Sequence, residues 1–192
     1  MSEETLIRHC APTLAGLKTG SLFTCPIEGK EALLESIRRI NRRFSEKGLR
    51  LLPLRFSEKK ALVYLYRPAR LSQDLSNATA ARILQEQGYP TGNCQQCILQ
   101  LARKLRSQPD FPHEIGLFLG YPAEDVCGFI EQGPDCCKCT GCWKVYADEE
   151  SARKAFARYK KCTKVYCDRW KKGADIDRLA VPCRDAQMEC NN

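Results

Sequence analysis

Residues 49–67, LRLLPLRFSEKKALVYLYR, contain the pattern that decides the fold. Apolar runs at 49–56 and 61–67 flank the polar residues 57–60, which predicts two strands joined as a hairpin. The second run is apolar on both faces, so we expect it to lie inside a sheet. Pro53 has no amide hydrogen to donate and therefore directs the first strand to an edge.

Helical periodicity and capping residues predict helices on both sides of this hairpin. The first is expected over 29–47, where an apolar stripe runs through Leu33, Leu34, Ile37, Ile40 and Phe44 until Gly48 ends the helix. Further helices are expected at about 71–88, 93–106, 123–131 and 149–172, with Asn93 and Asp148 as N-caps and Pro122 near the start of the third.

The apolar segments 115–119 and 143–146 predict two more strands. Strands joined as a hairpin, together with strands separated by helices, indicate a mixed sheet with helices packed on it. We therefore predict an α/β fold of the mixed α+β class, a single globular domain over 1–182 with a sheet of about four strands. Residues 183–192 are expected to form a flexible tail.

Composition and charge narrow the function classes. The 192 residues are 43% hydrophobic and 28% charged, which is typical of a globular domain. No apolar run approaches the roughly 18 residues of a membrane helix, and the acidic start Met1-Ser2-Glu3-Glu4 is unlike a signal peptide. We therefore expect a cytoplasmic protein without a membrane partner.

The net charge of +8 is concentrated in residues 30–106, which hold sixteen Lys or Arg and six Asp or Glu. Arg38, Arg39, Arg42 and Arg43 lie off the apolar stripe of the first helix. This excess is modest for nucleic-acid binding, which we do not expect. A solvated basic face explains it, and so does a surface that docks an acidic protein partner.

Three segments resemble one bacterial family. They are residues 9–23 (HCAPTLAGLKTGSLF), residues 113–130 with HEIGLFLGYP, and residues 141–146 (GCWKVY). Over essentially its whole length the chain is similar to an uncharacterised family of anaerobic, mostly clostridial, bacteria that is described only as a domain of unknown function. Genes of such proteins often lie near iron-transport and flavodoxin genes, so the resemblance implies a role in iron or redox physiology and a redox or metal-handling partner.

Four of the thirteen cysteines form a cluster of candidate metal ligands: Cys136, Cys137, Cys139 and Cys142. The Cys139-Thr-Gly-Cys142 spacing lets two sulfurs reach one ion. Cys136 or Cys137 is expected to supply a third ligand, and Cys162 or Cys167 a fourth. Thiolates suit zinc, copper(I), iron or an iron–sulfur cluster, and the alternative is a loop of free thiols. The family pattern does not fix these cysteines.

A second pair of cysteines, Cys94-Gln-Gln-Cys97, begins the helix expected at 93–106. The helix dipole at such a position lowers the pKa of a thiol, which would suit a redox pair. No predicted strand leads into it, as a thioredoxin-like motif requires, so we expect a structural pair on the inner face of the helix.

Both histidines, His9 and His113, lie in the segments that resemble the family. If those segments meet, His9, Cys10, His113 and Glu114 form a metal site or a nucleophile–base pair. Lys18, Tyr121 and Lys144 are then the polar neighbours that hold a cofactor or substrate. The alternative is that His113 orders a loop and His9 lies near a mobile end.

These observations lead to three hypotheses of different classes. The leading hypothesis is a cytosolic protein that binds a metal ion or an iron–sulfur centre through its cysteines, in metal or redox handling. The second is an enzyme of unknown substrate that uses the His, Cys and Glu site. The third is a non-catalytic adaptor for an acidic partner. The residues define no reaction.

Overall fold

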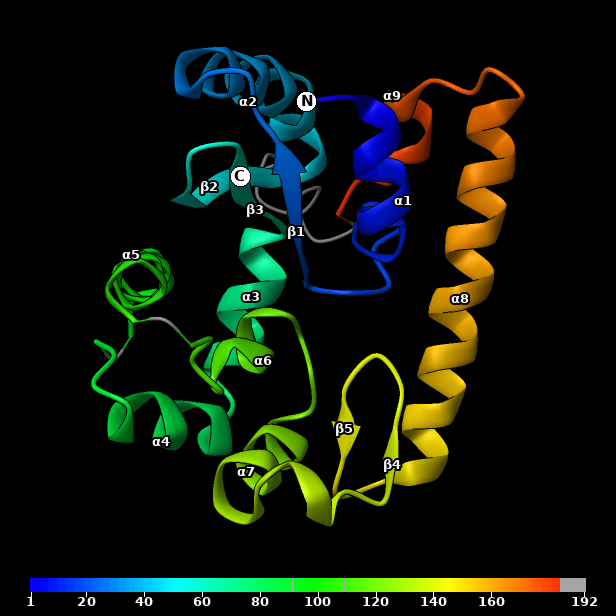
Figure 1. Ribbon diagram of the computed structural model, residues 1–192. Helices are drawn as coiled ribbons and strands as arrows, with labels where there is room; N and C mark the ends of the chain where they lie inside the picture. Colours follow the sequence, from blue (N-terminus) through cyan, green and yellow to red (C-terminus); the bar gives the residue numbers. More distant parts are fainter. Residues whose placement is uncertain (91, 109, 184–192) are drawn as a thin grey trace, which may run out of the picture. The chain divides into compact units, whose positions relative to one another are not determined.

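The computed structural model describes residues 1–90, 92–108 and 110–183, and the chain divides into two compact units. Unit 1 is Met1–Ala69 with Lys161–Asn192, and unit 2 is Arg70–Lys160. Figure 1 shows the elements of both units coloured along the sequence. The single domain expected over 1–182 stays a prediction. Apart from Cys183, the tail expected at 183–192 lies outside the described residues.

Unit 1 contains a three-stranded antiparallel sheet of order β1-β3-β2. β1 (Gly20–Pro26) and β2 (Arg50–Phe56) flank β3 (Lys60–Tyr66), which is buried at every position after Lys60. The hairpin predicted from residues 49–67 is therefore confirmed, with its second strand inside the sheet. The register of β2 shifts between Pro53 and Arg55, at the strand that the proline was expected to place at an edge.

Helices cover the sheet of unit 1 and enclose its core. α1 (Glu3–Leu14) packs on β1, α2 (Lys30–Phe44) packs on β2, and α9 (Ile176–Leu179) contacts α1. The predicted stripe of α2 is buried at Leu33, Ile37, Ile40 and Phe44. The short helix η1 (Ser45–Lys47) follows, and Gly48 ends it with a φ of +66°. The sequence patterns did not predict α1, β1 or α9.

Arg67 follows β3 and is buried inside unit 1, with 2% of its surface exposed. It donates hydrogen bonds to the carbonyl oxygens of Thr13 at 2.8 Å, Leu14 at 2.9 Å and Val181 at 2.7 Å. The last carbonyls of a helix have no partner within that helix. Arg67 therefore stabilises the C-terminal end of α1 and fixes the chain that follows α9.

Unit 2 is mainly helical. Its helices are α3 (Pro68–Leu75), α4 (Ala78–Glu86), α5 (Cys94–Ser107), α6 (Ile115–Phe118), α7 (Ala123–Gln132), η2 (Pro134–Cys136) and α8 (Glu149–Lys171), of which α3 begins and α8 ends in unit 1. A short antiparallel hairpin, β4 (Cys139–Thr140) with β5 (Lys144–Val145), separates η2 from α8. The predicted N-caps are confirmed: the side chain of Asn93 accepts from the amide of Gln96, and that of Asp148 from the amide of Ser151.

Two predictions for unit 2 are wrong in detail. The strand expected at 115–119 is the helix α6, because a short apolar run does not distinguish a buried helix from a buried strand. The single helix expected at 71–88 is two helices, α3 and α4. Its periodicity is interrupted at Asn77, whose side chain accepts hydrogen bonds from the amides of Thr79 and Ala80 and caps α4.

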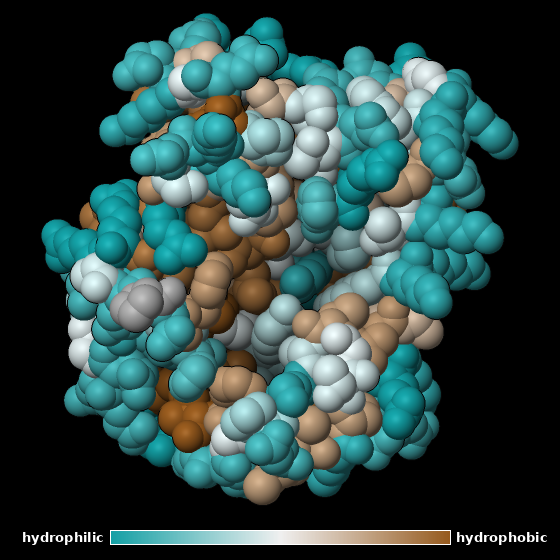
Figure 2. All heavy atoms as spheres, in the orientation of Figure 1, coloured by the Kyte–Doolittle hydropathy of each residue, from teal (hydrophilic) through white to brown (hydrophobic). Residues whose placement is uncertain are grey.

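The mixed α+β class is confirmed, whereas the strands differ from the expected four-stranded mixed sheet. The main sheet has three strands, all antiparallel, and the segment expected as a strand at 143–146 pairs only with β4. Figure 2 shows mainly hydrophilic side chains on the visible face of α8, a helix whose buried residues are Ala152 and Tyr159. Across residues 1–90, 92–108 and 110–183, no helix has both the length and the apolarity to cross a bilayer.

Candidate functional site

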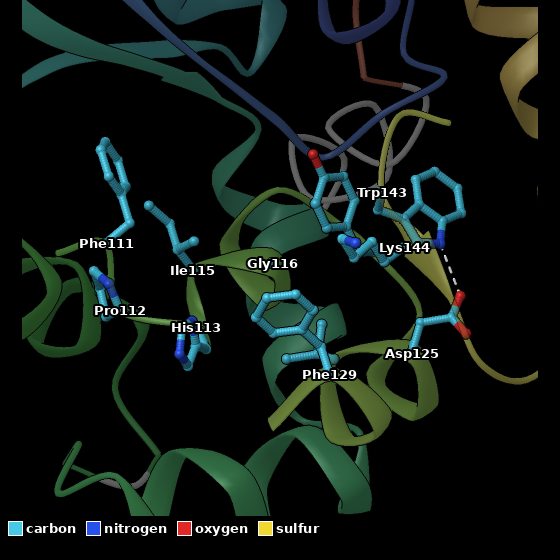
Figure 3. A pocket seen from close by; sticks show the side chains of 11 residues that line it. Phe111, Pro112, His113, Ile115, Gly116, Asp125, Phe129, Trp143 and Lys144 are labelled. Carbon is cyan, nitrogen blue, oxygen red and sulfur yellow. Dashed lines mark hydrogen bonds between the residues drawn. The ribbon is translucent and has the colours of Figure 1, made fainter. Parts of the chain in front are cut away.

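Unit 2 contains a cavity of about 280 Å³ that lies between three of its segments. The loop before α6, the α6–α7 pair and the β4–β5 hairpin each contribute a wall. Figure 3 shows the residues from 111 to 115 on one side, the hairpin residues on the other and the Phe129 ring between them. The lining residues are Phe111, Pro112, His113, Ile115, Gly116, Tyr121, Asp125, Val126, Phe129, Trp143 and Lys144.

The α6–α7 wall depends on close packing at Gly116. A Cβ atom at Gly116 would lie 2.8 Å from Val126 Cγ2 and 3.0 Å from the ring of Tyr121, which is closer than side chains tolerate. Gly120 then turns the chain with a φ of +72°, a conformation that favours glycine. The two glycines of the segment 113–122 therefore bring α6 against α7 and place Tyr121 in the wall of the cavity.

Asp125 joins the α7 wall to the hairpin wall. It is 2% exposed and accepts hydrogen bonds from the indole Nε1 of Trp143 at 2.7 Å and from the amides of Tyr146 at 2.7 Å and Ala147 at 2.8 Å. The first of these bonds is drawn in Figure 3. Three donors, together with the N-terminal end of α7, compensate the buried negative charge.

Aromatic rings build most of the hairpin side of the cavity. Trp143 stacks on Tyr121, with ring centroids 5.0 Å apart, and meets Phe156 of α8 edge-on at 4.5 Å. Burial is the main reason why the pKa of Tyr121 is raised to about 12, with smaller contributions from Cys142 and Tyr159. The phenol of Tyr121 therefore stays neutral near pH 7 and adds no charge to the wall.

Two nitrogen-bearing side chains interrupt this apolar lining. The Lys144 ammonium donates to the carbonyl oxygen of Pro134 at 2.7 Å, which uses one of its three protons. His113 is exposed and lies edge-on to Phe129, with ring centroids 4.9 Å apart. The cavity thus combines apolar and aromatic walls with one cation, one imidazole and the buried Asp125 carboxylate.

Glu114, the predicted partner of His113, belongs to a different group of side chains. It is 2% exposed and accepts from the Tyr89 hydroxyl at 2.9 Å and from the Lys104 ammonium at 2.7 Å. The same ammonium lies 4.6 Å from the centre of the Tyr89 ring. A buried carboxylate with two such partners holds the loop after α5 in place, and it is not one of the residues that line the cavity.

The other half of the predicted catalytic group lies in unit 1. His9 is exposed and stacks on Phe23 with ring centroids 5.6 Å apart, whereas Cys10 is buried in the core. Burial raises the pKa of Cys10, and the nearby Lys18 charge only partly offsets this effect, so its thiol is not disposed to act as a nucleophile. Because His9 and Cys10 lie in unit 1 and His113 and Glu114 in unit 2, a site formed by all four stays a prediction.

The predicted metal ligands all lie in unit 2, between the end of η2 and the turn of the β4–β5 hairpin: Cys136, Cys137, Cys139 and Cys142. Cys136 and Cys142 are exposed, and Cys137 and Cys139 are half-buried. Among the described residues, no three or more His, Cys, Asp or Glu side chains are arranged to hold an ion. Cys162 and Cys167, the further ligands expected, lie on the part of α8 in unit 1.

The pair Cys94 and Cys97 has the properties of a structural pair. Burial, followed by the neighbouring Cys97, raises the pKa of Cys94 to about 11. The thiol of Cys97 lies 3.1 Å from the Pro90 carbonyl oxygen, to which it donates. Desolvation therefore outweighs the helix dipole here, and the raised pKa disfavours the thiolate that a redox pair needs.

Several residues of the cavity were not singled out from the sequence. Phe129, Asp125 and Trp143 were noted only as parts of segments that resemble the family. Their common signal is that all three lie in segments 113–130 and 141–146. Nothing in the sequence of these segments shows that the Asp125 carboxylate accepts a hydrogen bond from the Trp143 indole, because that contact exists only in the folded chain.

The fold and the cavity define the class first: a cysteine-rich α+β protein whose second unit encloses an apolar, aromatic cavity. Residues 6–180 match the family described as "Protein of unknown function (DUF3793)". The chain belongs to this family. No curated protein and no solved structure matches the chain.

Proposed function

We propose that unit 2 binds a small aromatic molecule that carries one acidic group. The observation that carries this proposal is the cavity of about 280 Å³, whose walls are apolar and aromatic apart from a few polar groups. Small-molecule sites in proteins have this composition, because apolar walls supply affinity and a few polar groups fix orientation. The volume is slightly below the roughly 300 Å³ lower end of common ligand pockets, so it suits one or two rings.

The aromatic character of the ligand follows from the lining. Phe129 and Tyr121 offer ring surfaces, and Ile115 and Val126 add aliphatic contacts. Ring pairs gain about 0.5–1.5 kcal/mol beyond simple burial when they meet offset or edge-on. A flat ligand is therefore favoured over an aliphatic chain of equal size.

The acidic group follows from the charges at the cavity. Lys144 retains donors beyond the one that bonds to Pro134, and His113 offers a second nitrogen. Asp125 also lines the cavity, but its carboxylate already accepts from three donors of the hairpin. An anion beside Lys144 is therefore favoured, and a cationic ligand is not.

The proposal is tested by comparing an aromatic carboxylate with its neutral carboxamide, for example indole-3-acetate and indole-3-acetamide. We expect calorimetric titration to show tighter binding of the acid by about tenfold, since a charge-assisted hydrogen bond at a partly exposed position contributes about 1.4 kcal/mol. Lys144→Met keeps the aliphatic stem and removes the charge, so it should abolish this preference while amide binding remains.

Lys154→Met is the matched control, because Lys154 is an exposed lysine of α8 that pairs with Glu150 at 2.6 Å. It should leave the preference for the acid unchanged. Equal affinities for acid and amide in the unaltered protein, or an unchanged preference in Lys144→Met, would contradict the proposal.

The enzyme and adaptor hypotheses stay predictions. The enzyme hypothesis needs His9 and Cys10 to reach His113 and Glu114, and the buried states of Cys10 and Glu114 give it no support. The basic surface that the adaptor hypothesis needs is still present in part, because Arg38, Arg39 and Arg42 are exposed on α2. Metal or iron–sulfur binding by the cysteines, the leading hypothesis from the sequence, also stays a prediction.

A further inference from the structure

Four thiols of unit 2 lie within seven consecutive residues, and we call them the hairpin thiols: Cys136, Cys137, Cys139 and Cys142. They are not among the residues that line the cavity. None of the four is in a disulfide, and each is at least partly open to solvent. By contrast, Cys10 and Cys25 are buried in the core of unit 1. The hairpin thiols are thus placed to meet a solute, and packing does not explain them.

The turn between β4 and β5 fixes two of these thiols close together in the chain. Cys139 pairs with Val145, and the amide of Gly141 donates to the carbonyl of Trp143 at 3.0 Å. Gly141 is pressed against α8, where an added Cβ would lie 2.2 Å from the Phe156 ring. Cys139 and Cys142 therefore sit on one tight, supported turn with the two-residue spacing that lets two sulfurs bind one ion.

A third thiol lies beside this turn. The sulfur of Cys137 is 3.5 Å from the Thr140 hydroxyl, on the residue next to Cys139. Because no three ligands of the described chain already surround one point, a bound ion has to draw Cys137 inward. Gly133, with a φ of +75°, precedes this segment, and at its other end the Lys138 amide donates to the Val145 carbonyl oxygen at 2.8 Å, so the displacement of Cys137 would involve residues 134–137.

The surroundings carry positive charge. Lys138 and Lys144 belong to the same segment, and the charge of Arg153 on α8 interacts with Cys139. Three thiolates around a divalent cation leave one net negative charge, and these basic side chains offset it. The hairpin and α8 together therefore offset the charge of such a complex, although Arg153 also pairs with Glu149 at 2.6 Å.

We propose that the hairpin thiols bind one thiophilic divalent cation, such as Zn²⁺, with Cys139, Cys142 and Cys137 as its ligands. Each ligating thiol releases its proton to solvent and forms a metal–sulfur bond, with no change of oxidation state. Trp143 and Lys144 directly follow Cys142, so the bound cation also steadies one wall of the cavity. This last consequence rests on the proposed function, whereas metal binding does not.

The test uses the reduced full-length protein under anaerobic conditions, with Cd²⁺ as the probe because its thiolate complexes absorb in the near ultraviolet. Trp170→Phe leaves Trp143 as the single tryptophan, so its fluorescence reports on the hairpin. We expect about one equivalent of Cd²⁺ to produce the charge-transfer band, to release about three protons and to change the Trp143 emission.

Cys139→Ser/Cys142→Ser should lose the band and the emission change, whereas Cys94→Ser/Cys97→Ser is the matched control with the same spacing and should retain both. If the first double variant does not fold, Cys142→Ser alone replaces it in the test, because Cys142 is exposed and its substitution should not disturb folding. The proposal is overturned if the unaltered protein gives no band, or if the band is equally strong without Cys139 and Cys142.

Discussion

Asp125 lies in the first turn of α7, and its two carboxylate oxygens accept hydrogen bonds from three donors of the following hairpin. The first turn of a helix is a common position for an acidic residue, so the sequence indicates only a favourable interaction with the helix dipole. In the folded protein Asp125 has a further role that the sequence does not indicate: its carboxylate fixes Trp143 and thereby one wall of the cavity.

Asp125→Asn should destabilise the protein by about 2–4 kcal/mol. The amide keeps the shape of the carboxylate, but its NH₂ group then faces an N–H donor of the hairpin, and neither can accept. Denaturant unfolding measures this change. Glu124→Gln is the matched control in the same turn of α7, where the side chain is exposed, and it should change stability by under about 0.5 kcal/mol. Equal stability of the two variants would show that the three bonds do not hold the hairpin.

At the scale of elements, the contact between the hairpin and α8 is made possible by a missing side chain. Gly141 lies so close to the Phe156 ring that a Cβ would come within 2.2 Å of it, and Phe156 in turn packs edge-on against Trp143. The glycine is needed here for space and not for its backbone conformation, because its φ lies outside the left-handed region.

Gly141→Ala should therefore cost about 1–3 kcal/mol of stability, as overpacking of a close contact does. Gly29→Ala is the comparison, since nothing lies within 4 Å of a Cβ at Gly29, and it should cost less than about 1 kcal/mol. The additional Phe156→Ala should remove the penalty of Gly141→Ala in a double-mutant cycle. A penalty that is independent of Phe156 would contradict the packing account.

The elements that were predicted have local signals, and those that were missed lack them. The β2–β3 hairpin follows from alternation and polar turn residues, and the start of α5 follows from Asn93. α6 was mistaken for a strand because Ile115–Phe118 is too short to show a period. α1 contains Pro12, which argues against a helix in sequence patterns although the helix forms here.

The cavity could not be predicted at all by such reasoning. His113, Tyr121 and Lys144 were selected as polar residues of recognisable segments, and all three do line it. The apolar residues that give the cavity its shape look like ordinary core residues in the sequence. Their arrangement depends on where α6, α7 and the hairpin meet, and no local pattern encodes this.

At the scale of the whole molecule, the excess of positive charge is partly used within the fold. Arg43 of α2 pairs with Glu3, with Asp175 at 3.1 Å and with Asp177 at 3.0 Å, so it joins three segments of unit 1. It was expected on a solvated face, but its side chain is only 32% exposed, because it packs against acidic residues of α1 and of the α9 segment to form these pairs. Its neighbour Arg42 does face solvent.

The central claim concerns the occupant of the cavity in unit 2, and nuclear Overhauser effects from a bound aromatic carboxylate test it most directly. With indole-3-acetate and methyl-labelled protein, we predict contacts from the ligand ring to the methyl groups of Ile115 and Val126 and to the Phe129 ring. Contacts confined to exposed apolar residues elsewhere, such as Leu99 and Val165, would contradict the account.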